Sequence, residues 1–275
     1  MKIRLDLFAK EAVLFFFTLA IGIYSAYRYS LETAVKTERQ LHFSPGDILF
    51  SIIFLSLFFI IFTRFKKAAK YSFRIFLILL IFFGAQAVLG VVFGPPLDNL
   101  LSLAILLLYL FMPNILVQDI AVAFAIGGIS SVFGISIMPG IAAVLLVALS
   151  VYDIVAVYKT KHMIALAKEM VSSGAIFGFI IPADWKDFFF SRHEAHVGER
   201  FMILGSGDVG LPLILSASVA TTSLSDAVVV ALFSIAGLFV THLLFVTQEG
   251  KRRPMAALPP IATMTVIGYL VTILF

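Results

Sequence analysis

The sequence predicts an all-α polytopic membrane protein with about nine transmembrane helices. Of its 275 residues, 61% are hydrophobic and only 13% are charged, whereas soluble domains carry about 25% charged residues. The apolar residues also gather in runs close to the roughly 20 residues that a helix needs to span a bilayer. The absence of cysteine excludes disulfides, thiolate metal sites and cysteine nucleophiles. The net charge of +4 is typical of basic cytoplasmic loops, so we expect no nucleic-acid partner.

Nine apolar runs are the candidate spans. The first follows Lys2 and Arg4 but is longer than the roughly 7–15 residues of a signal-peptide core, so we expect a retained helix. Turn signals such as Pro139-Gly140 separate several of the later runs. In order, the expected spans are Leu7–Tyr27, Asp47–Thr63, Ser72–Phe93, Leu100–Leu116, Ile120–Met138, Gly140–Tyr158, Phe201–Val219, Ala227–Val246 and Met255–Phe275.

The long polar segment 159–200 divides the chain into two membrane parts. Residues 1–158 would form a six-helix part and residues 201–275 a three-helix part, within one membrane domain. Lys and Arg favour the cytoplasmic side of a membrane. If the N-terminus is cytoplasmic, 17 of the 20 Lys and Arg residues lie on the cytoplasmic side of the membrane. The other three are Arg28, Lys36 and Arg39. We therefore predict that the N-terminus and the segment 159–200 are cytoplasmic and that the C-terminus lies outside.

Most acidic residues near the expected spans lie at their edges, namely Asp47, Asp98, Asp119 and Asp226, but two lie within the spans. Asp153 is about five residues from the cytoplasmic end of the sixth span, and Asp208 is about seven residues from the cytoplasmic start of the seventh. At 1.5 Å per residue these depths are roughly 8 and 10 Å. Ionisable side chains inside a membrane are costly and usually mark function, so the matched depths predict a carboxylate dyad.

Such a dyad can hydrolyse a peptide bond without a metal or a cofactor. Two neighbouring carboxylates do not easily both ionise, so one holds a proton while the other stays charged. The charged Asp can take a proton from water while the protonated Asp polarises the carbonyl. Gly205 and Gly207 leave room beside Asp208 for a substrate or a facing helix. The residues alone leave another interpretation open, in which both acids are packing groups or proton-relay sites of a transporter.

A proline element opens the ninth span on the same side of the membrane as both acids. Ala256-Ala257-Leu258-Pro259-Pro260 contains two residues without backbone donors. We expect these prolines to loosen the first turn of the helix, so that exposed carbonyl groups can take up a substrate backbone near the dyad.

Together these motifs resemble the presenilin and signal peptide peptidase family of intramembrane aspartyl proteases, and the small size resembles its microbial, archaeal-type members. The resemblance lies in Tyr152-Asp153, in Gly205-x-Gly207-Asp208 and in Ala257-Leu258-Pro259, in that order. It implies that Asp153 and Asp208 are catalytic and that Ala257 and Leu258 shape the site. Ala256 stands where the family usually has a proline. A prepilin-peptidase-type aspartyl protease and an ion- or proton-coupled transporter remain as alternatives.

The resemblance implies transmembrane segments of other membrane proteins as substrates, in a multi-pass enzyme that we expect in the cell membrane. No obligate partner is evident from the sequence. Among the other polar residues, we expect Gln86 and His242 to be interhelical hydrogen-bond partners. We expect Glu11 to snorkel towards the interface or to pair with Lys10 or Arg4. No spacing among the histidines argues for a metal site.

Gly174–Ile181 has the composition of a strand or of a surface segment. A transmembrane substrate must be unwound before cleavage, which exposes backbone groups that hydrocarbon cannot satisfy. We expect Gly174–Ile181 to accept them by strand addition, with Met255–Leu258 as a second edge. We further expect Gly174–Ile181 to be loosely packed without substrate.

Overall fold

The computed structural model describes residues 5–34, 66–159, 174–192, 201–247 and 255–274, and these residues are mostly helical. The α-helices are α1 Leu5–Ala34, α3 Lys66–Phe93, α4 Leu97–Phe111, α5 Ile115–Ser136, α6 Pro139–Ile154, α8 Ser206–Ala220, α9 Leu224–Val246 and α10 Leu258–Leu274. In the described residues, α1, α3, α5, α6 with its continuation, and α9 are long and apolar enough to cross a membrane, while α4, α8 and α10 are shorter apolar helices.

The predicted class of a helical, multi-pass membrane protein is thereby confirmed. The expected span Asp47–Thr63 lies outside the described residues. The count of nine spans and the orientation of the termini stay predictions.

One small departure from the predicted helical architecture is a two-stranded antiparallel sheet. Strand β1 covers Gly178–Pro182 and strand β2 covers Phe201–Gly205, with Gly178 opposite Gly205 and Ile180 opposite Ile203. The expected span Phe201–Val219 therefore begins as a strand, and its helix, α8, starts only at Ser206. A short apolar run fits a strand or a helix equally well, so the sequence pattern does not show this boundary.

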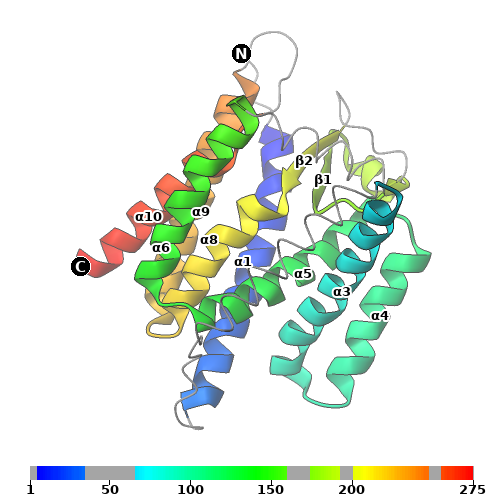
Figure 1. Ribbon diagram of the computed structural model, residues 1–275, viewed down its shortest axis with the longest axis horizontal. Helices are drawn as coiled ribbons and strands as arrows, with labels where there is room; N and C mark the ends of the chain where they lie inside the picture. The colour runs from blue at the N-terminus through cyan, green and yellow to red at the C-terminus, as the bar shows by residue number, and fades with distance from the viewer. Residues whose placement is uncertain (1–4, 35–65, 160–173, 193–200, 248–254, 275) are drawn as a thin grey trace.

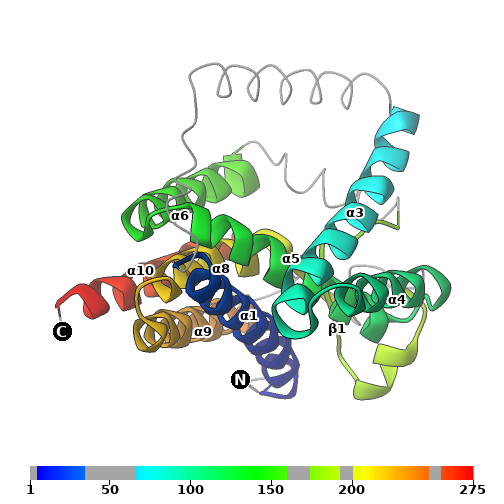
Figure 2. The same ribbon diagram turned by 90° about the horizontal axis from the view of Figure 1, so that it is seen from below.

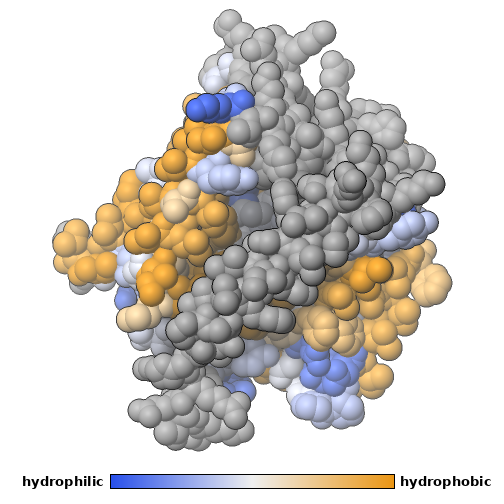
Figure 3. Space-filling model, in the orientation of Figure 1, coloured by the Kyte–Doolittle hydropathy of each residue, from blue (hydrophilic) through white to orange (hydrophobic). Residues whose placement is uncertain are grey.

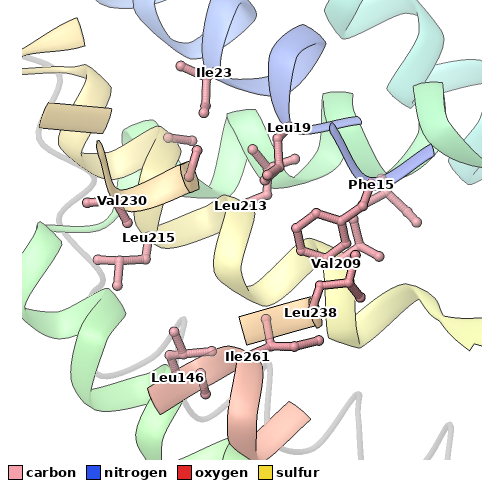
Figure 4. Packing of buried hydrophobic residues seen from close by; sticks show 14 of the residues in the cluster. Phe15, Leu19, Ile23, Leu146, Val209, Leu213, Leu215, Val230, Leu238 and Ile261 are labelled. Carbon is pink, nitrogen blue, oxygen red and sulfur yellow. The ribbon is translucent and has the colours of Figure 1, made fainter. Parts of the chain in front are cut away.

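Helix α8 lies at the centre of the bundle. It packs against α1, α5, α6, α9 and α10, and Figures 1 and 2 show it enclosed by these helices while α3 and α4 form the far side of the molecule. Figure 4 shows the core around α8, formed by Phe15, Leu19 and Ile23 of α1, Leu146 of α6, Val209, Leu213 and Leu215 of α8, Val230 and Leu238 of α9, and Ile261 of α10. The central position of α8 explains why Asp208, in its first turn, is surrounded by other helices.

The outer faces of the peripheral helices are apolar. On α4, Leu100, Leu103, Leu107 and Leu110 are exposed at the spacing of one helical face. The visible face in Figure 3 carries hydrophobic areas on both sides of the molecule. Exposed apolar surface of this extent is a feature of lipid contact, not of a soluble monomer.

Helices α3 and α5 approach each other through glycine. A Cβ atom added at Gly84 of α3 would lie 2.5 Å from Cα of Ala125 and 2.7 Å from its carbonyl oxygen. Both are backbone atoms of α5 and cannot move aside cheaply. Small residues permit such close helix contacts in membranes, so this contact holds the α3–α4 side against the central bundle.

We predict that Gly84→Ala lowers the free energy of unfolding by about 1–3 kcal/mol, as overpacking does. The matched control is Gly90→Ala on the same helix, where the nearest atoms to an added Cβ are 3.6 and 3.7 Å away. The measurement is thermal unfolding of both variants in detergent. Equal unfolding temperatures for the two variants would contradict the close contact.

Candidate active site

Asp153 lies near the end of α6, where the regular helix stops. The chain continues as a π-helical turn, η1 Val155–Lys159, a type of distortion that is frequent at functional sites. The Asp153 side chain is buried, and its carboxylate accepts a hydrogen bond from the backbone N–H of Leu258. Its Oδ2 atom is buried and has no hydrogen-bond partner in the described part of the chain. One oxygen of Asp153 is thus held by the backbone, and the other is available for chemistry.

Asp208 is held by the start of its own helix. Gly205 is the N-cap residue of α8, and Asp208 is the third residue of the helix. Its carboxylate accepts a hydrogen bond from the backbone N–H of Gly205, which is one half of a capping box. An added Cβ at Gly205 would lie 3.1 Å from Oδ2 of Asp208, so glycine leaves this approach open.

The two carboxylates are close enough for their charges to interact. Asp153 acts electrostatically on Asp208, and Glu11 of α1 acts on it more weakly. Two like charges at short range in a partly dehydrated site favour a state in which one group keeps its proton. A carboxyl pair of this kind can hold one proton donor and one proton acceptor.

The proline element contacts Asp153 through Leu258, the first residue of α10. The Leu258 N–H belongs to the first turn, where backbone donors have no partner within the helix, and the carboxylate of Asp153 supplies one. Pro259 and Pro260 follow at positions where a missing N–H costs nothing. The expectation that they loosen the first turn is wrong, because α10 is helical from Leu258 onward.

Helix α9 holds the segment before α10 in place. The hydroxyl of Thr241 donates to the carbonyl oxygen of Ala257 at 3.2 Å. A Cβ atom added at Gly237 would lie 2.7 Å from Cα of Ile261, so the two helices touch through this glycine. Ala256 and Leu258 are buried and Ala257 is partly buried as a result.

The remaining candidate residues lie around the two acids with different exposure. Tyr152 precedes Asp153, but its side chain is 56% exposed and points away from the core. Gly207 is exposed and has open space where a side chain would be. Pro259 is partly exposed in the first turn of α10. The open space at Gly207 leaves room beside Asp208, which is the role expected for this glycine.

Glu11 has a different partner from the one expected. Its Oε2 atom lies 3.0 Å from Nδ1 of His242 on α9, and both side chains are almost fully buried. Lys10 points elsewhere, to the carbonyl oxygens of Pro182 and Ala183, and Arg4 lies outside the described residues. Neighbours in a helix face different directions, which is why Lys10 and Glu11 do not pair. Among the described residues the partner of Glu11 is thus His242 and not the expected Lys10, and the pairing with Arg4 stays a prediction.

The expected interhelical roles of His242 and Gln86 are confirmed. His242 bonds Glu11 across α9 and α1, and Nε2 of Gln86 on α3 donates to Oδ1 of Asn99 on α4 at 2.8 Å. Within the described residues, no three His, Asp or Glu side chains are grouped so that they could hold a metal ion.

The strand expectation for Gly174–Ile181 is correct over part of its length, but the expected loose packing is wrong. Phe179, Ile180 and Ile181 are completely buried. The backbone N–H of Ile180 donates to Oδ1 of Asp119 at 2.8 Å, and Asp119 is itself completely buried in α5. From its position alone Asp119 was expected at the edge of a span. An acid in the second turn of an apolar helix was the only signal of its burial.

Comparisons with known proteins agree with this architecture. The family model described as "Signal-peptide peptidase, presenilin aspartyl protease" matches residues 31–275. No curated protein matches the chain. Two solved structures, described as a presenilin family intramembrane aspartate protease in the C222 and P2 space groups, are each 23% identical to the chain. The first covers 94% of both chains with a TM-score of 0.59, and the second 96% of both with a TM-score of 0.60.

We predict that His242→Leu lowers the free energy of unfolding by about 3–5 kcal/mol, because it leaves Glu11 buried without its partner. The double variant Glu11→Leu/His242→Leu should recover most of this loss, since replacing a buried pair by apolar residues is often neutral. Thermal unfolding in detergent gives the coupling free energy between the two sites. A double variant as unstable as the sum of the single variants would rule out the pair.

Proposed function

The chain belongs to the signal peptide peptidase and presenilin aspartyl protease family, and on that premise we propose that Asp153 and Asp208 are its catalytic dyad. The protein is an intramembrane aspartyl protease and therefore a hydrolase. The observation that carries the proposal is that the two acids lie on helices α6 and α8, which pack against each other, and that each carboxylate is held by a backbone N–H. The family favours this function over the transporter that the residues alone left open.

In the proposed reaction the dyad activates water against a peptide carbonyl. The charged carboxylate removes a proton from the water, whose oxygen forms a bond to the carbonyl carbon, while the protonated carboxylate donates a hydrogen bond to the carbonyl oxygen. The C–N bond then breaks and the amine leaves with a proton from the dyad. The proton taken from the water replaces the one that the dyad gives to the amine, so the pair ends with one proton, as it began.

The substrates in this proposal are transmembrane segments of other membrane proteins, cut near the cytoplasmic face. The cytoplasmic assignment rests on the distribution of Lys and Arg, which lie almost entirely on the side of Asp153 and Asp208. A substrate helix satisfies its own backbone groups, so it must be unwound before water can reach a peptide bond. The unwound stretch needs new hydrogen-bond partners near the dyad.

Strand β2 has an outer edge that can supply these partners. Ile180 gives its N–H to Asp119 and not to β2, so Ile180 and Ile203 form a pair without hydrogen bonds between them. By the alternation of an antiparallel pair, the backbone groups of Phe201 and Ile203 point away from β1. Because β2 runs directly into α8, a substrate strand on this edge would lie next to Asp208. This edge replaces Gly174–Ile181 as our candidate for strand addition.

We predict that Asp153→Ala and Asp208→Ala each abolish cleavage of a single-span substrate in liposomes, because each variant lacks one half of the acid–base pair. The control is Asp226→Ala, an acid in the first turn of α9; this variant should cleave at the wild-type rate. Size-exclusion profiles and thermal unfolding show whether each variant is folded. Near-wild-type turnover of either folded dyad variant would falsify the assignment.

We predict that Ile203→Pro impairs cleavage at least tenfold while the unfolding temperature changes little. The substitution removes an N–H that points away from β1, and proline is tolerated at such edge positions. Ile203→Val controls for the side chain. Met202→Pro is the contrasting variant, because its N–H faces β1 and its loss should lower stability as well. Wild-type turnover of Ile203→Pro would exclude strand addition at this edge.

A further inference from the structure

We propose that Lys10, Gln118 and Asp119 are positioning residues that determine which peptide bond of the substrate is cut. They bond the outer edge of β1 to helices α1 and α5 and so fix the place of the β2 edge beside Asp208. This inference rests on the proposed function, since it needs the substrate to pair with β2.

Side chains from α1 and α5 bond the outer edge of β1 and the segment directly before it. Nε2 of Gln118 donates to the carbonyl oxygen of Ile176 at 2.9 Å, and the N–H of Ile180 donates to Oδ1 of Asp119 at 2.8 Å. Nζ of Lys10 donates to the carbonyl oxygen of Pro182 at 3.0 Å. Pro182 itself has no N–H to offer. Three side chains therefore hold the edge that faces away from β2.

These three side chains come from two well-packed helices. Lys10 and Asp119 are almost completely buried, and Nζ of Lys10 also lies 5.0 Å from the centre of the Trp185 ring. The segment after β1 is fastened to the same helix end, since the N–H of Ile115 donates to the carbonyl oxygen of Phe190 and the N–H of Arg192 to that of Pro113. The hairpin of β1 and β2 is thus attached to α1 and α5 at several points on the side of β1.

Stability alone does not explain why the carboxyl group of Asp119 is buried in α5. Its Oδ2 atom is buried without a hydrogen-bond partner among the described residues. Burying a carboxyl group with one oxygen unpaired carries a penalty of roughly 1–3 kcal/mol or more. The oxygen that is paired holds the central residue of β1, directly opposite Ile203 in the register. Loss of this bond would therefore displace the β1–β2 hairpin at the point that most affects the β2 edge.

A displaced edge would present a different bond to the dyad. Successive residues of a strand are about 3.3 Å apart, and alternate residues share the same hydrogen-bonding direction. A hairpin that is free to move by a few ångström allows the substrate to pair two residues away. The main product should then be accompanied by products that are shifted by two residues.

The experiment compares Asp119→Leu with Asp119→Asn on one single-span substrate, well below the unfolding temperature. Mass spectrometry gives the distribution of cleavage sites, and initial rates give kcat and KM. Asp119→Asn keeps an oxygen that accepts from Ile180 and should cut at the wild-type bond. Asp119→Leu should yield products shifted by two residues and lower kcat about tenfold at similar KM, the size expected for one lost hydrogen bond of about 1.4 kcal/mol.

Asp98→Leu is the matched control for a general loss of stability. Asp98 is also a buried acid in the first turns of a helix, but it bonds the N–H of Asn99 in α4 and not the hairpin. Its cleavage sites should not change. If Asp98→Leu broadens the cleavage sites as much as Asp119→Leu does, or if folded Asp119→Leu cuts like the wild type, the proposal is overturned.

Two further variants test the positioning role if Asp119→Leu does not fold. Gln118→Leu and Lys10→Met each remove one of the other bonds to β1, and both should shift the cleavage sites in the same way. Unchanged sites in both variants overturn the proposal. The variant Ile203→Pro distinguishes failure of this proposal from failure of the proposed function. If Ile203→Pro impairs cleavage while the variants of Lys10, Gln118 and Asp119 leave the cleavage sites unchanged, substrate pairing with β2 stands and only the positioning role is lost.

Discussion

Around the candidate site, in the described part of the chain, three carboxylates accept a backbone N–H that no helix or strand satisfies. Asp153 accepts from Leu258 at the start of α10, Asp208 from Gly205 at the start of α8, and Asp119 from Ile180 on the outer edge of β1. An unpaired N–H in a membrane interior costs several kcal/mol, and a carboxylate there is equally costly without donors. Each group therefore stabilises the other. The backbone N–H groups that lack a partner in a helix or strand and the buried acids therefore satisfy each other's hydrogen-bonding needs.

This mutual dependence explains how the site can be both held and reactive. Asp153 and Asp208 each accept one hydrogen bond from the backbone, which fixes the side chain. Oδ2 of Asp153 remains without a partner in the described part of the chain. The bonds come from the starts of two different helices, α8 and α10, which pack against each other and against α6. A change in the packing of these helices would move both acids relative to each other. The close contact at Gly237, where α9 touches the α10 backbone, restrains that movement.

The helices and the membrane depth of the two acids could be predicted from the sequence, but the hydrogen-bond partners of the buried polar groups could not. Apolar runs predicted the described helices because a bilayer imposes a minimum length on them, and charges inside those runs identified Asp153 and Asp208. The run at Phe201–Gly205 has no feature that separates a strand from a helix. The partner of Glu11 could not be predicted because His242 is 231 residues away. The burial of Asp119 could not be predicted because it depends on a contact with Ile180, which is 61 residues away.

The outer edge of β1 is bonded by side chains, whereas the outer edge of β2 has backbone groups that point outward. This difference bears on which substrates the protein can bind. An open strand edge invites pairing with any extended chain, and β1 is closed against this by Lys10, Gln118, Asp119 and Pro182. The β2 edge offers only the outward groups of Phe201 and Ile203, because the N–H of Gly205 is taken by Asp208. At about 1 kcal/mol for each net hydrogen bond, so short an edge cannot unwind a stable helix. On the proposed function, the protease therefore selects transmembrane segments whose helix is already weak near the cytoplasmic face.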